Sequence, residues 1–345
     1  MRSLKIINSI AALLITTISV AQDVHFSQVE NAPFNLNPAL AGANAPMMGI
    51  VNYRTQWNSV ASPYNTISAS YDARFNENQF QKKGIIAGGI NFYNDNSGDN
   101  RVSTTNVSIN LAYHLILDRE NTIGLGIYGG YGQRSLSANN GMWASQYNGT
   151  SYDASIASGE TFNSASFGYM DAGAGILYTN RIGEGYMTQN NKRVINAGVA
   201  FFHVNSPNFG FIENANEKLK MRMTVFANSL IGISNSPGAI MPAVYFNYQG
   251  SAMELQYGMY YRYALTEGSK MTGRSKPSSL SLGLFHRWGD AIIPKFMFEW
   301  YTLTFGFAYD VNISKLTDAS HAKGGMEFSL KYTMETGGTS KAKIR

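Results

Sequence analysis

The stretch GGMEFSLKYTM, residues 324–334, alternates strictly between two kinds of side chain. The apolar members occupy every second position, namely Met326, Phe328, Leu330, Tyr332 and Met334. The polar members between them are Glu327, Ser329, Lys331 and Thr333. A β-strand directs alternate side chains to opposite faces, so this segment has one apolar face and one charged face. A soluble sandwich would bury the apolar face, whereas a membrane barrel would turn it toward lipid.

The same alternation recurs along the chain, for example at 106–115 (NVSINLAYHL) and at 302–310 (TLTFGFAYD). Such segments run about 9 to 12 residues, which suits a tilted strand that crosses a bilayer and exceeds the usual length of soluble strands. Turn signals divide the chain into about fourteen expected strands, near 47–54, 64–75, 84–94, 103–115, 122–134, 168–179, 192–203, 219–231, 239–248, 252–263, 278–288, 291–299, 301–311 and 324–334. The predicted fold class is all-β: a transmembrane antiparallel β-barrel with a partly plugged lumen.

The composition favours the membrane alternative. Charged residues make up 14 % of the chain and aromatic residues 13 %, whereas a typical soluble domain carries about 25 % charged residues. Isolated charges of both signs fall on the strand faces expected to point inward: Asp72, Arg74, His114, Lys220, Arg222, Glu254, Arg262, Lys295, Glu299, Asp310, Glu327 and Lys331. This pattern is typical of a crowded, wet lumen in which opposite charges pair. A secreted soluble β protein is the alternative.

Other classes find little support. After residue 21 no apolar run reaches the roughly 18 residues that a transmembrane helix needs, so a closed barrel is the remaining way to span a membrane. The net charge of +5 is mild for 345 residues, and no nucleic-acid partner is expected. The chain has no Cys, which excludes disulfides and thiolate metal sites.

The front of the chain indicates export. Arg2 and Lys5 precede an apolar run, and small residues stand at 19–21, so residues 1–21 are expected to be a secretory signal peptide rather than a membrane anchor. The expected organisation continues with an N-terminal segment at or in the periplasmic mouth (22–46), an outer-membrane barrel (47–334) and a polar C-terminal tail (335–345). An even strand number would place both ends of the barrel in the periplasm and the long 135–167 connector outside the cell.

Several motifs are specific. Residues 22–42 read QDVHFSQVENAPFNLNPALAG, YRTQW follows at 53–57, and FFHVNSP, AYDVNISKL and GGMEF begin at 201, 308 and 324. These stretches resemble the PorP/SprF family of outer-membrane proteins, which belongs to the type IX secretion system of the Bacteroidota. The resemblance assigns a structural or partner-binding role to Asn37, Pro38, Ala39, Leu40, Ala41, Gly42, Tyr53, Arg54, Gln56, Trp57, Asp310 and Glu327. The family usually has a His directly before this Glu, and here the position is Met326.

The resemblance also implies a function without enzymatic activity. It points to an outer-membrane barrel that assists the export or surface attachment of a partner protein, such as a large gliding adhesin. A core barrel of the apparatus, linked to a periplasmic peptidoglycan-binding lipoprotein, is the alternative, and a porin-like solute channel is a third. The expected partners are a secreted type IX substrate, other components of the system and outer-membrane lipid.

Two segments are candidates for partner binding. The stretch 22–42 is too apolar and Pro-rich for an ordinary tail, so it is expected to enter the barrel or pack at its mouth; a plug with no partner role is the other interpretation. The 135–167 connector carries Trp143, Tyr147, Tyr152 and Phe162 among Ser and Asn. These aromatics could form an extracellular binding loop or fold inward over the barrel mouth. For Arg54, a local contact with Trp57 is the favoured interpretation.

No catalytic or cofactor motif stands out. The five histidines are far apart and none shows a metal-binding spacing. The glycines at 124–129 have the spacing of a nucleotide loop, but they fall inside an expected strand, where a bulky neighbour is the better explanation. No Ser-His-Asp pattern is evident. The expectation is a protein without a metal, a cofactor or an enzymatic site.

Overall fold

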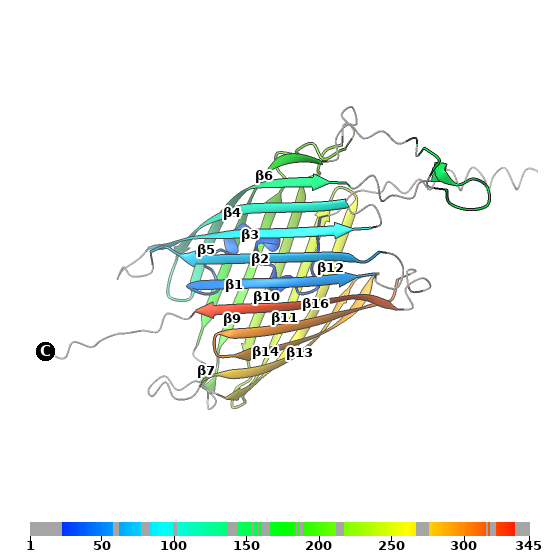
Figure 1. Cartoon of the computed structure of the whole chain (residues 1–345). Helices are drawn as coiled ribbons and strands as arrows, with labels where there is room; N and C mark the ends of the chain where they lie inside the picture. The colour runs from blue at the N-terminus through cyan, green and yellow to red at the C-terminus, as the bar shows by residue number, and fades with distance from the viewer. Residues whose placement is uncertain are drawn as a thin grey trace, which may run out of the picture.

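The computed structural model describes residues 23–57, 62–76, 83–98, 102–136, 144–153, 155–157, 159, 166–183, 185–186, 189–211, 217–266, 276–314, 317 and 322–334. Fourteen of its strands form a closed antiparallel barrel (Figure 1). These are β1 (Met47–Gln56), β2 (Tyr64–Arg74), β3 (Gly84–Ser97), β4 (Val102–Ile116), β5 (Asn121–Ser135), β6 (Ser166–Ile182), β9 (Arg193–Phe202), β10 (Arg222–Gly232), β11 (Gly238–Gln249), β12 (Ala252–Thr266), β13 (Ser278–Arg287), β14 (Ala291–Trp300), β15 (Leu303–Asn312) and β16 (Lys323–Met334).

The barrel closes where the first strand meets the last. Strand β1 pairs with β16 from Met47↔Met334 to Gln56↔Gly325. The predicted fold class and all fourteen predicted strands are confirmed, with ends that differ by a few residues. A short hairpin of β7 (Gly185–Tyr186) and β8 (Gln189–Asn190) was not predicted. The expected signal peptide, the C-terminal tail, Trp143 and Phe162 lie outside the described residues.

The described part of the chain contains no helix whose length and apolar character would let it span a membrane. The alternation along the strands decides which face meets the membrane. On β16, Leu330 is 51 % exposed whereas Glu327 is 1 % exposed. The same contrast separates Leu111 from its neighbour Asn110 on β4. The apolar face therefore points outward and the polar face points into the lumen, as predicted.

The two ends of the barrel differ. We call "base" the end where β1 begins and β16 ends, and "loop end" the opposite one, which holds the 136–165 and 203–221 connectors. Strands β3 to β6 have 14 to 17 residues, whereas β13 to β15 have ten each. On the longer strands the outward side chains change from apolar to polar toward the loop end, at Asn94, Ser103, Gln133 and Ser166. This part, the raised wall, therefore extends beyond the apolar band.

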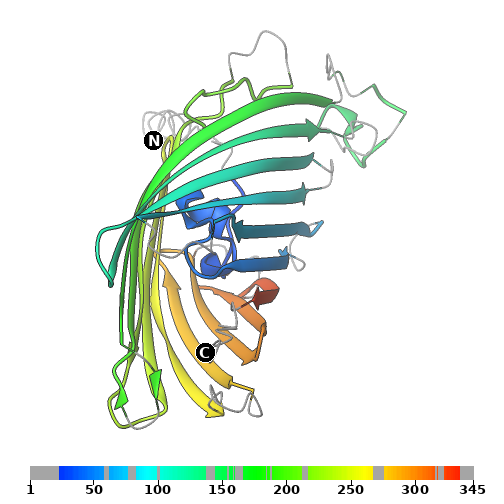
Figure 2. The same ribbon diagram turned by 90° about the vertical axis from the view of Figure 1, so that its left-hand side faces the viewer.

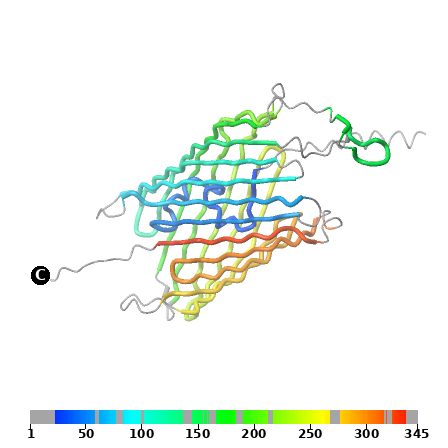
Figure 3. Tube along the Cα trace, viewed as in Figure 1, coloured from blue at the N-terminus to red at the C-terminus, as the bar shows by residue number. Residues whose placement is uncertain are grey.

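Residues 23–46 fill the lumen, and we call them the plug. Figures 2 and 3 show this segment in blue inside the barrel. It contains three short helical turns, η1 (Val29–Asn31), α2 (Pro33–Leu36) and η2 (Pro38–Leu40), and Pro33 and Pro38 begin two of them, where no N–H donor is needed. Asp23 contacts the end of β11 at the loop end and Gly42 contacts Asp72 near the base. The plug thus runs the full length of the lumen rather than lying at one mouth.

Candidate functional site: the plugged lumen

Asn37 holds the middle of the plug against two strands. Its Nδ2 donates to the carbonyl oxygens of Ile176 (3.0 Å) and Val199 (3.2 Å), and its Oδ1 accepts from the N–H of Ala39 (2.8 Å). A Cβ on Gly175 would lie 2.2 Å from Asn37 Oδ1. A glycine in the wall therefore makes room for this side chain, which binds carbonyl oxygens of both β6 and β9.

Two further glycines face the plug in the same way. A Cβ on Gly126 would lie 2.2 Å from the backbone nitrogen of Ala39, and one on Gly89 would lie 2.3 Å from the ring of Phe34. Gly126 belongs to the run 124–129, whose spacing resembles a nucleotide loop. Here it serves the close approach of a second backbone segment, as expected for glycine inside a strand.

The end of the NPALAG stretch (37–42) is fixed near the base. His114 Nε2 lies 2.7 Å from the carbonyl oxygen of Ala41. The N–H of Gly42 donates to Asp72 Oδ2 (2.7 Å), and Arg74 Nε donates to the carbonyl oxygen of Gly42 (2.7 Å). Gly42 has φ of 65°, a left-handed conformation that favours glycine. These contacts fix the bend after which the plug ends and the chain continues into β1.

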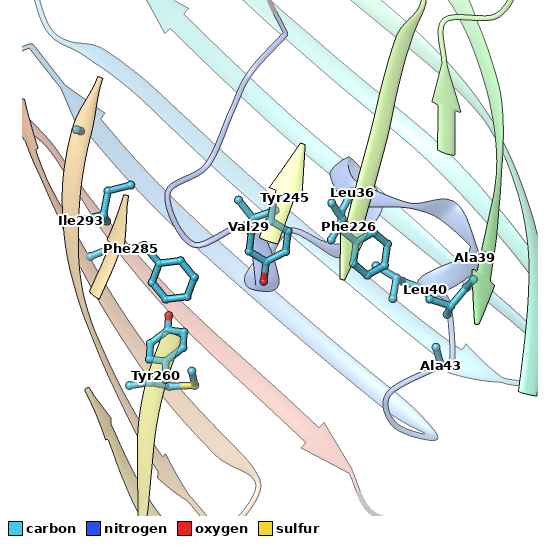
Figure 4. Close-up of a cluster of buried hydrophobic side chains, with 14 residues drawn as sticks. Val29, Leu36, Ala39, Leu40, Ala43, Phe226, Tyr245, Tyr260, Phe285 and Ile293 are labelled. Atoms are coloured by element: carbon cyan, nitrogen blue, oxygen red, sulfur yellow. The ribbon is translucent and has the colours of Figure 1, made fainter. Parts of the chain in front are cut away.

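Apolar packing supports the same region. Leu36, Leu40 and Ala39 of the plug belong to one buried cluster with Phe226 and Tyr245 of the wall, shown in Figure 4. All five side chains are at most 4 % exposed. The lumen here is a packed core, so removal of a large side chain would leave a cavity.

Ser27 is the centre of a buried polar cluster near the loop end. Its N–H donates to Glu327 Oε2 (2.7 Å) and its hydroxyl donates to Asp310 Oδ1 (2.5 Å). The next N–H, that of Gln28, donates to Glu327 Oε1 (3.1 Å). One carboxyl group thus accepts two successive backbone donors of the plug.

Two arginines neutralise these carboxylates. Arg54 Nη2 lies 3.0 Å from Asp310 Oδ2 and its Nη1 lies 3.6 Å from Glu327 Oε2. Arg287 Nη1 lies 3.1 Å from Asp310 Oδ2. We call Ser27, Arg54, Arg287, Asp310 and Glu327 the clasp. All four charged side chains are at most 6 % exposed, so each charge depends on the others.

The clasp corrects the prediction for Arg54. Its guanidinium does not stack on Trp57, which instead packs against Tyr64 with ring centroids 4.7 Å apart. Arg54 faces the lumen because it lies on the inward parity of β1, and it also donates to Gln56 Oε1 (2.9 Å). Tyr53 faces outward and is 42 % exposed. The motif YRTQW therefore distributes its side chains over both faces of the wall.

The first described residues are anchored at the loop end by a second cluster. His203 Nε2 lies 2.5 Å from Asp23 Oδ2, and its Nδ1 lies 2.9 Å from Asp171 Oδ2. Arg222 Nη1 lies 3.1 Å from the same Asp23 oxygen. Burial alone would lower the pKa of His203, but the carboxylates of Asp23 and Asp171 raise it to about 9. Burial would raise the pKa of Asp23, but His203 and Arg222 hold it well below its usual value.

A third ion pair lies between these clusters and the apolar core. Lys295 Nζ lies 3.2 Å from Glu30 Oε2, and Tyr260 also hydrogen-bonds to Glu30. The ammonium group lies 3.8 Å from the ring centroid of Phe285. A lysine with no exposed side-chain surface remains charged only with such partners.

The structure brings together three of the predicted motif residues and places the others apart. Arg54, Asp310 and Glu327 meet in the clasp, and Asn37 and Gly42 fix the plug further toward the base. Sequence reasoning missed Ser27, Asp23, His203 and Arg287. The inward parity of Arg287 on β13 was a usable signal, whereas nothing in the sequence showed that Ser27 would reach it.

The predicted loop aromatics divide into described and undescribed residues. Tyr147 and Tyr152 form an isolated β-bridge and are 59 % and 43 % exposed. These two rings are therefore not buried in the barrel mouth. Their role as a binding surface stays a prediction.

The space left beside the plug is small. Between the described residues, one cavity of about 60 Å³ lies next to Val24, Val29 and Met253, and another of about 30 Å³ lies next to Tyr93 and Asn106. No group of three or more His, Asp or Glu side chains in the described ranges could hold a metal ion. The titratable groups of the clasp, the Asp23 cluster and the Glu30–Lys295 pair bind the plug or each other. Chemically, this arrangement fixes a segment of chain inside the barrel.

Comparison with known proteins identifies a family. The sequence profile of the family described as type IX secretion system membrane protein PorP/SprF matches residues 18–332. No curated protein matches the chain significantly. Among solved structures, BamA from Haemophilus ducreyi is 9 % identical, with 84 % of this chain and 71 % of that chain covered and a TM-score of 0.44. CdiB from Acinetobacter baumannii is 8 % identical over 83 % and 60 %, with a TM-score of 0.42. The β domain of the Bordetella autotransporter BrkA is 8 % identical over 84 % and 99 %, with a TM-score of 0.36.

Proposed function

The chain belongs to the PorP/SprF family of type IX secretion membrane proteins, and from this premise we propose that it assists the export or surface attachment of a partner protein by binding it at the loop end. The observation that supports this proposal is the plug. The clasp, the Asp23 cluster and the packed core fix the plug inside the lumen, which supports a barrel that acts without passing a polypeptide through itself. The outer surfaces of the barrel are then the parts available to a partner.

The loop end is the favoured surface. It carries the two longest connectors, 136–165 and 203–221, and the raised wall that extends beyond the apolar band. If the base faces the periplasm, as an even strand number implies, these features face outside the cell. The partner would then be a secreted type IX substrate, such as a large adhesin, and the barrel would act by binding and without catalysis.

A second role involves the base. The β7–β8 hairpin extends the base between β6 and β9, and it offers a contact for another component of the system. In that case the barrel would be a core part of the apparatus and would bind a periplasmic lipoprotein. Both roles fit an outer-membrane barrel of this family, and they differ in the end of the barrel that is occupied.

One experiment tests the proposal. The gene is deleted, the exported proteins are quantified by mass spectrometry, and the tagged barrel is purified in mild detergent with its bound partners. We expect loss of one or a few exported proteins and their recovery with the barrel. Unchanged export of every protein would contradict a substrate-assisting role. Loss of all type IX export, with a lipoprotein as the bound partner, would favour the role at the base.

A further inference from the structure

Strand β6 is longer than the neighbour on one of its sides. Strand β9 pairs with it only from Ala174↔Phe201 to Ile182↔Arg193. Strand β5 pairs with it along its whole length, as far as Ser135↔Ser166. Residues 166–172 therefore form a sheet edge at the loop end, in the raised wall. We call this stretch the β6 edge.

Several backbone groups of the β6 edge have no hydrogen-bond partner among the described residues. The carbonyl oxygen of Ala172 accepts from the N–H of Val204 (3.1 Å), and that of Met170 accepts from Asn205 Nδ2 (2.7 Å). Even-numbered residues thus direct their hydrogen-bonding groups away from β5. Within the described ranges, no group binds the N–H and C=O of Ser166 and Gly168 or the N–H of Met170. A strand laid along this edge would find both donors and acceptors.

The edge carries only part of the usual protection against pairing: among the described residues, Val204 and Asn205 bind it at Ala172 and Met170, and Asp171 points inward. Natural edge strands are commonly protected by Lys, Pro, a bulge or a covering loop. The stretch SFGYMDA (166–172) contains neither Lys nor Pro, and its pairing with β5 shows no register shift. The chain that leaves β9 covers the inner face instead, where Phe209 packs on Phe167 and Tyr169 at 6.3 and 5.3 Å between ring centroids. Met170 remains 67 % exposed.

The surroundings limit what can occupy the edge. Outward side chains beside its far end, Gln133 and Ser135 on β5 and Ser166 on β6, are polar, so this end of the edge lies outside the apolar band, whereas Met170 and its partner Tyr131 lie at the border of that band. Lys218 and Lys220 are exposed on the chain that returns past the end of β9 into β10. Together with the exposed Glu217 they give residues 217–220 a net charge of +1, which disfavours a basic strand nearby. A neutral or acidic strand avoids that repulsion.

We propose that the β6 edge binds an extended, neutral or acidic segment of the exported partner as an added β-strand. Main-chain hydrogen bonds to residues 166–170 supply the affinity, and an apolar side chain beside Met170 supplies selectivity. This inference rests on the proposed function and gives that function a contact site. It requires no passage through the lumen.

Photo-crosslinking in cells tests the inference. A photoreactive amino acid replaces Met170 in one strain and Phe201 in a control strain. Phe201 is also exposed and faces outward, but it lies within the paired part of β9. We expect an adduct with an exported protein at position 170 and none at 201, with the crosslinked peptide identified by mass spectrometry. Adducts at 170 only with a second copy, with lipid or with the chain's own loops would overturn the inference.

A backbone variant separates edge pairing from side-chain contact. With the photoreactive group moved to Ser166, Met170→Pro removes the free N–H and Met170→Ala does not. Because edges tolerate Pro where no ladder hydrogen bond is lost, both variants should fold, which a heat-modifiability gel checks. We expect the adduct yield to fall about tenfold for Met170→Pro only, as loss of one or two hydrogen bonds predicts. Equal yields in the two variants would refute pairing at this edge.

The two proposals can fail separately. If deletion of the gene abolishes export of a protein but no adduct with that protein forms at position 170, the proposed function stands and the edge inference is wrong. If deletion leaves all export unchanged, the proposed function itself fails. An adduct that maps to one extended segment of an export-dependent protein supports both.

Discussion

Ser27 shows how single residues decide the state of the lumen. Its N–H donates to Glu327 of β16, and its hydroxyl donates to Asp310 of β15. Those carboxylates need Arg54 and Arg287, because a buried charge without a partner is far more costly than a paired one. A short polar residue in the plug therefore contacts side chains of four strands, β1, β13, β15 and β16. The clasp is a property of side chains rather than of the strand pattern.

The first prediction concerns Arg54. Arg54→Ala leaves Asp310 and Glu327 buried with less compensation, so we expect a loss of about 3 to 5 kcal/mol in the free energy of unfolding. Urea unfolding in lipid vesicles, followed by tryptophan fluorescence, measures it. The control is Arg119→Ala in the exposed 117–120 turn, which should change stability by less than about 0.5 kcal/mol. Equal effects of the two substitutions would show that the clasp does not stabilise the barrel.

The second prediction concerns pH and His203. The folded pKa of about 9 lies above the unfolded value near 6.5, so the protonated imidazole stabilises the fold below about pH 6.5, and this stabilisation is lost as the pH rises through 9. The loss should reach about 3 kcal/mol between about pH 6 and pH 10. Unfolding curves at several pH values measure it. Tyr and Lys groups titrate at the upper end too, so the quantity that decides is the difference between the parent and His203→Gln. A parallel pH dependence in both proteins would contradict the role of His203.

At the scale of elements, the strands were predictable and the path of the plug was not. Each strand repeats a period of two with turn residues between, so the local pattern alone indicates fourteen strands and their facing. Leu330 and Glu327 show why this works. They point to opposite faces of β16, and lipid favours an apolar side chain on one face while the lumen accepts a polar one on the other. The plug has no period, because its order comes from contacts such as Asn37 with Ile176 and Ser27 with Glu327. These partners are 139 and 300 residues apart in the sequence, so a local pattern cannot predict that they meet. For the same reason Arg54 was assigned to its neighbour Trp57.

The third prediction tests the contact between wall and plug on β5. Gly126→Ala places a Cβ 2.2 Å from the backbone of Ala39, and a backbone cannot move aside as a flexible side chain does. We expect a loss of about 1 to 3 kcal/mol or more, measured by urea unfolding in vesicles. Gly129→Ala is a matched control on the same strand, since no atom lies within 4 Å of its new Cβ. If both variants were equally stable, the plug would not be seated on β5 as described.

At the scale of the whole molecule, the barrel is uneven in height. Strands β13 to β15 are just long enough to cross the apolar band, while β3 to β6 continue beyond it with polar outward side chains. A membrane of uniform thickness therefore covers only the lower part of the raised wall. The far end of the β6 edge lies in the uncovered part, which is what makes it available to a partner.

The fourth prediction tests this boundary on one strand and one face. Leu111→Arg puts a charge in the middle of the outward apolar run of β4, so we expect a loss of about 2 to 4 kcal/mol. Ser103→Arg changes an outward residue of the same strand in the raised wall and should cost less than about 1 kcal/mol. Refolding yields into vesicles and urea midpoints compare the two. Similar losses would place Ser103 within the hydrocarbon and remove the argument for an exposed β6 edge.

The fifth prediction concerns conductance, because a filled lumen and a solute channel give opposite results. The plug occupies the lumen from Asp23 at the loop end to Gly42 near the base, and two cavities beside it, between described residues, measure about 60 and 30 Å³. Spaces of this size hold a few water molecules. The purified protein in planar bilayers should therefore show no steady open state, whereas an open porin inserted from the same detergent serves as the positive control. A large, stable pore would mean that the plug leaves the lumen, and export through the barrel would then have to replace binding at its loop end.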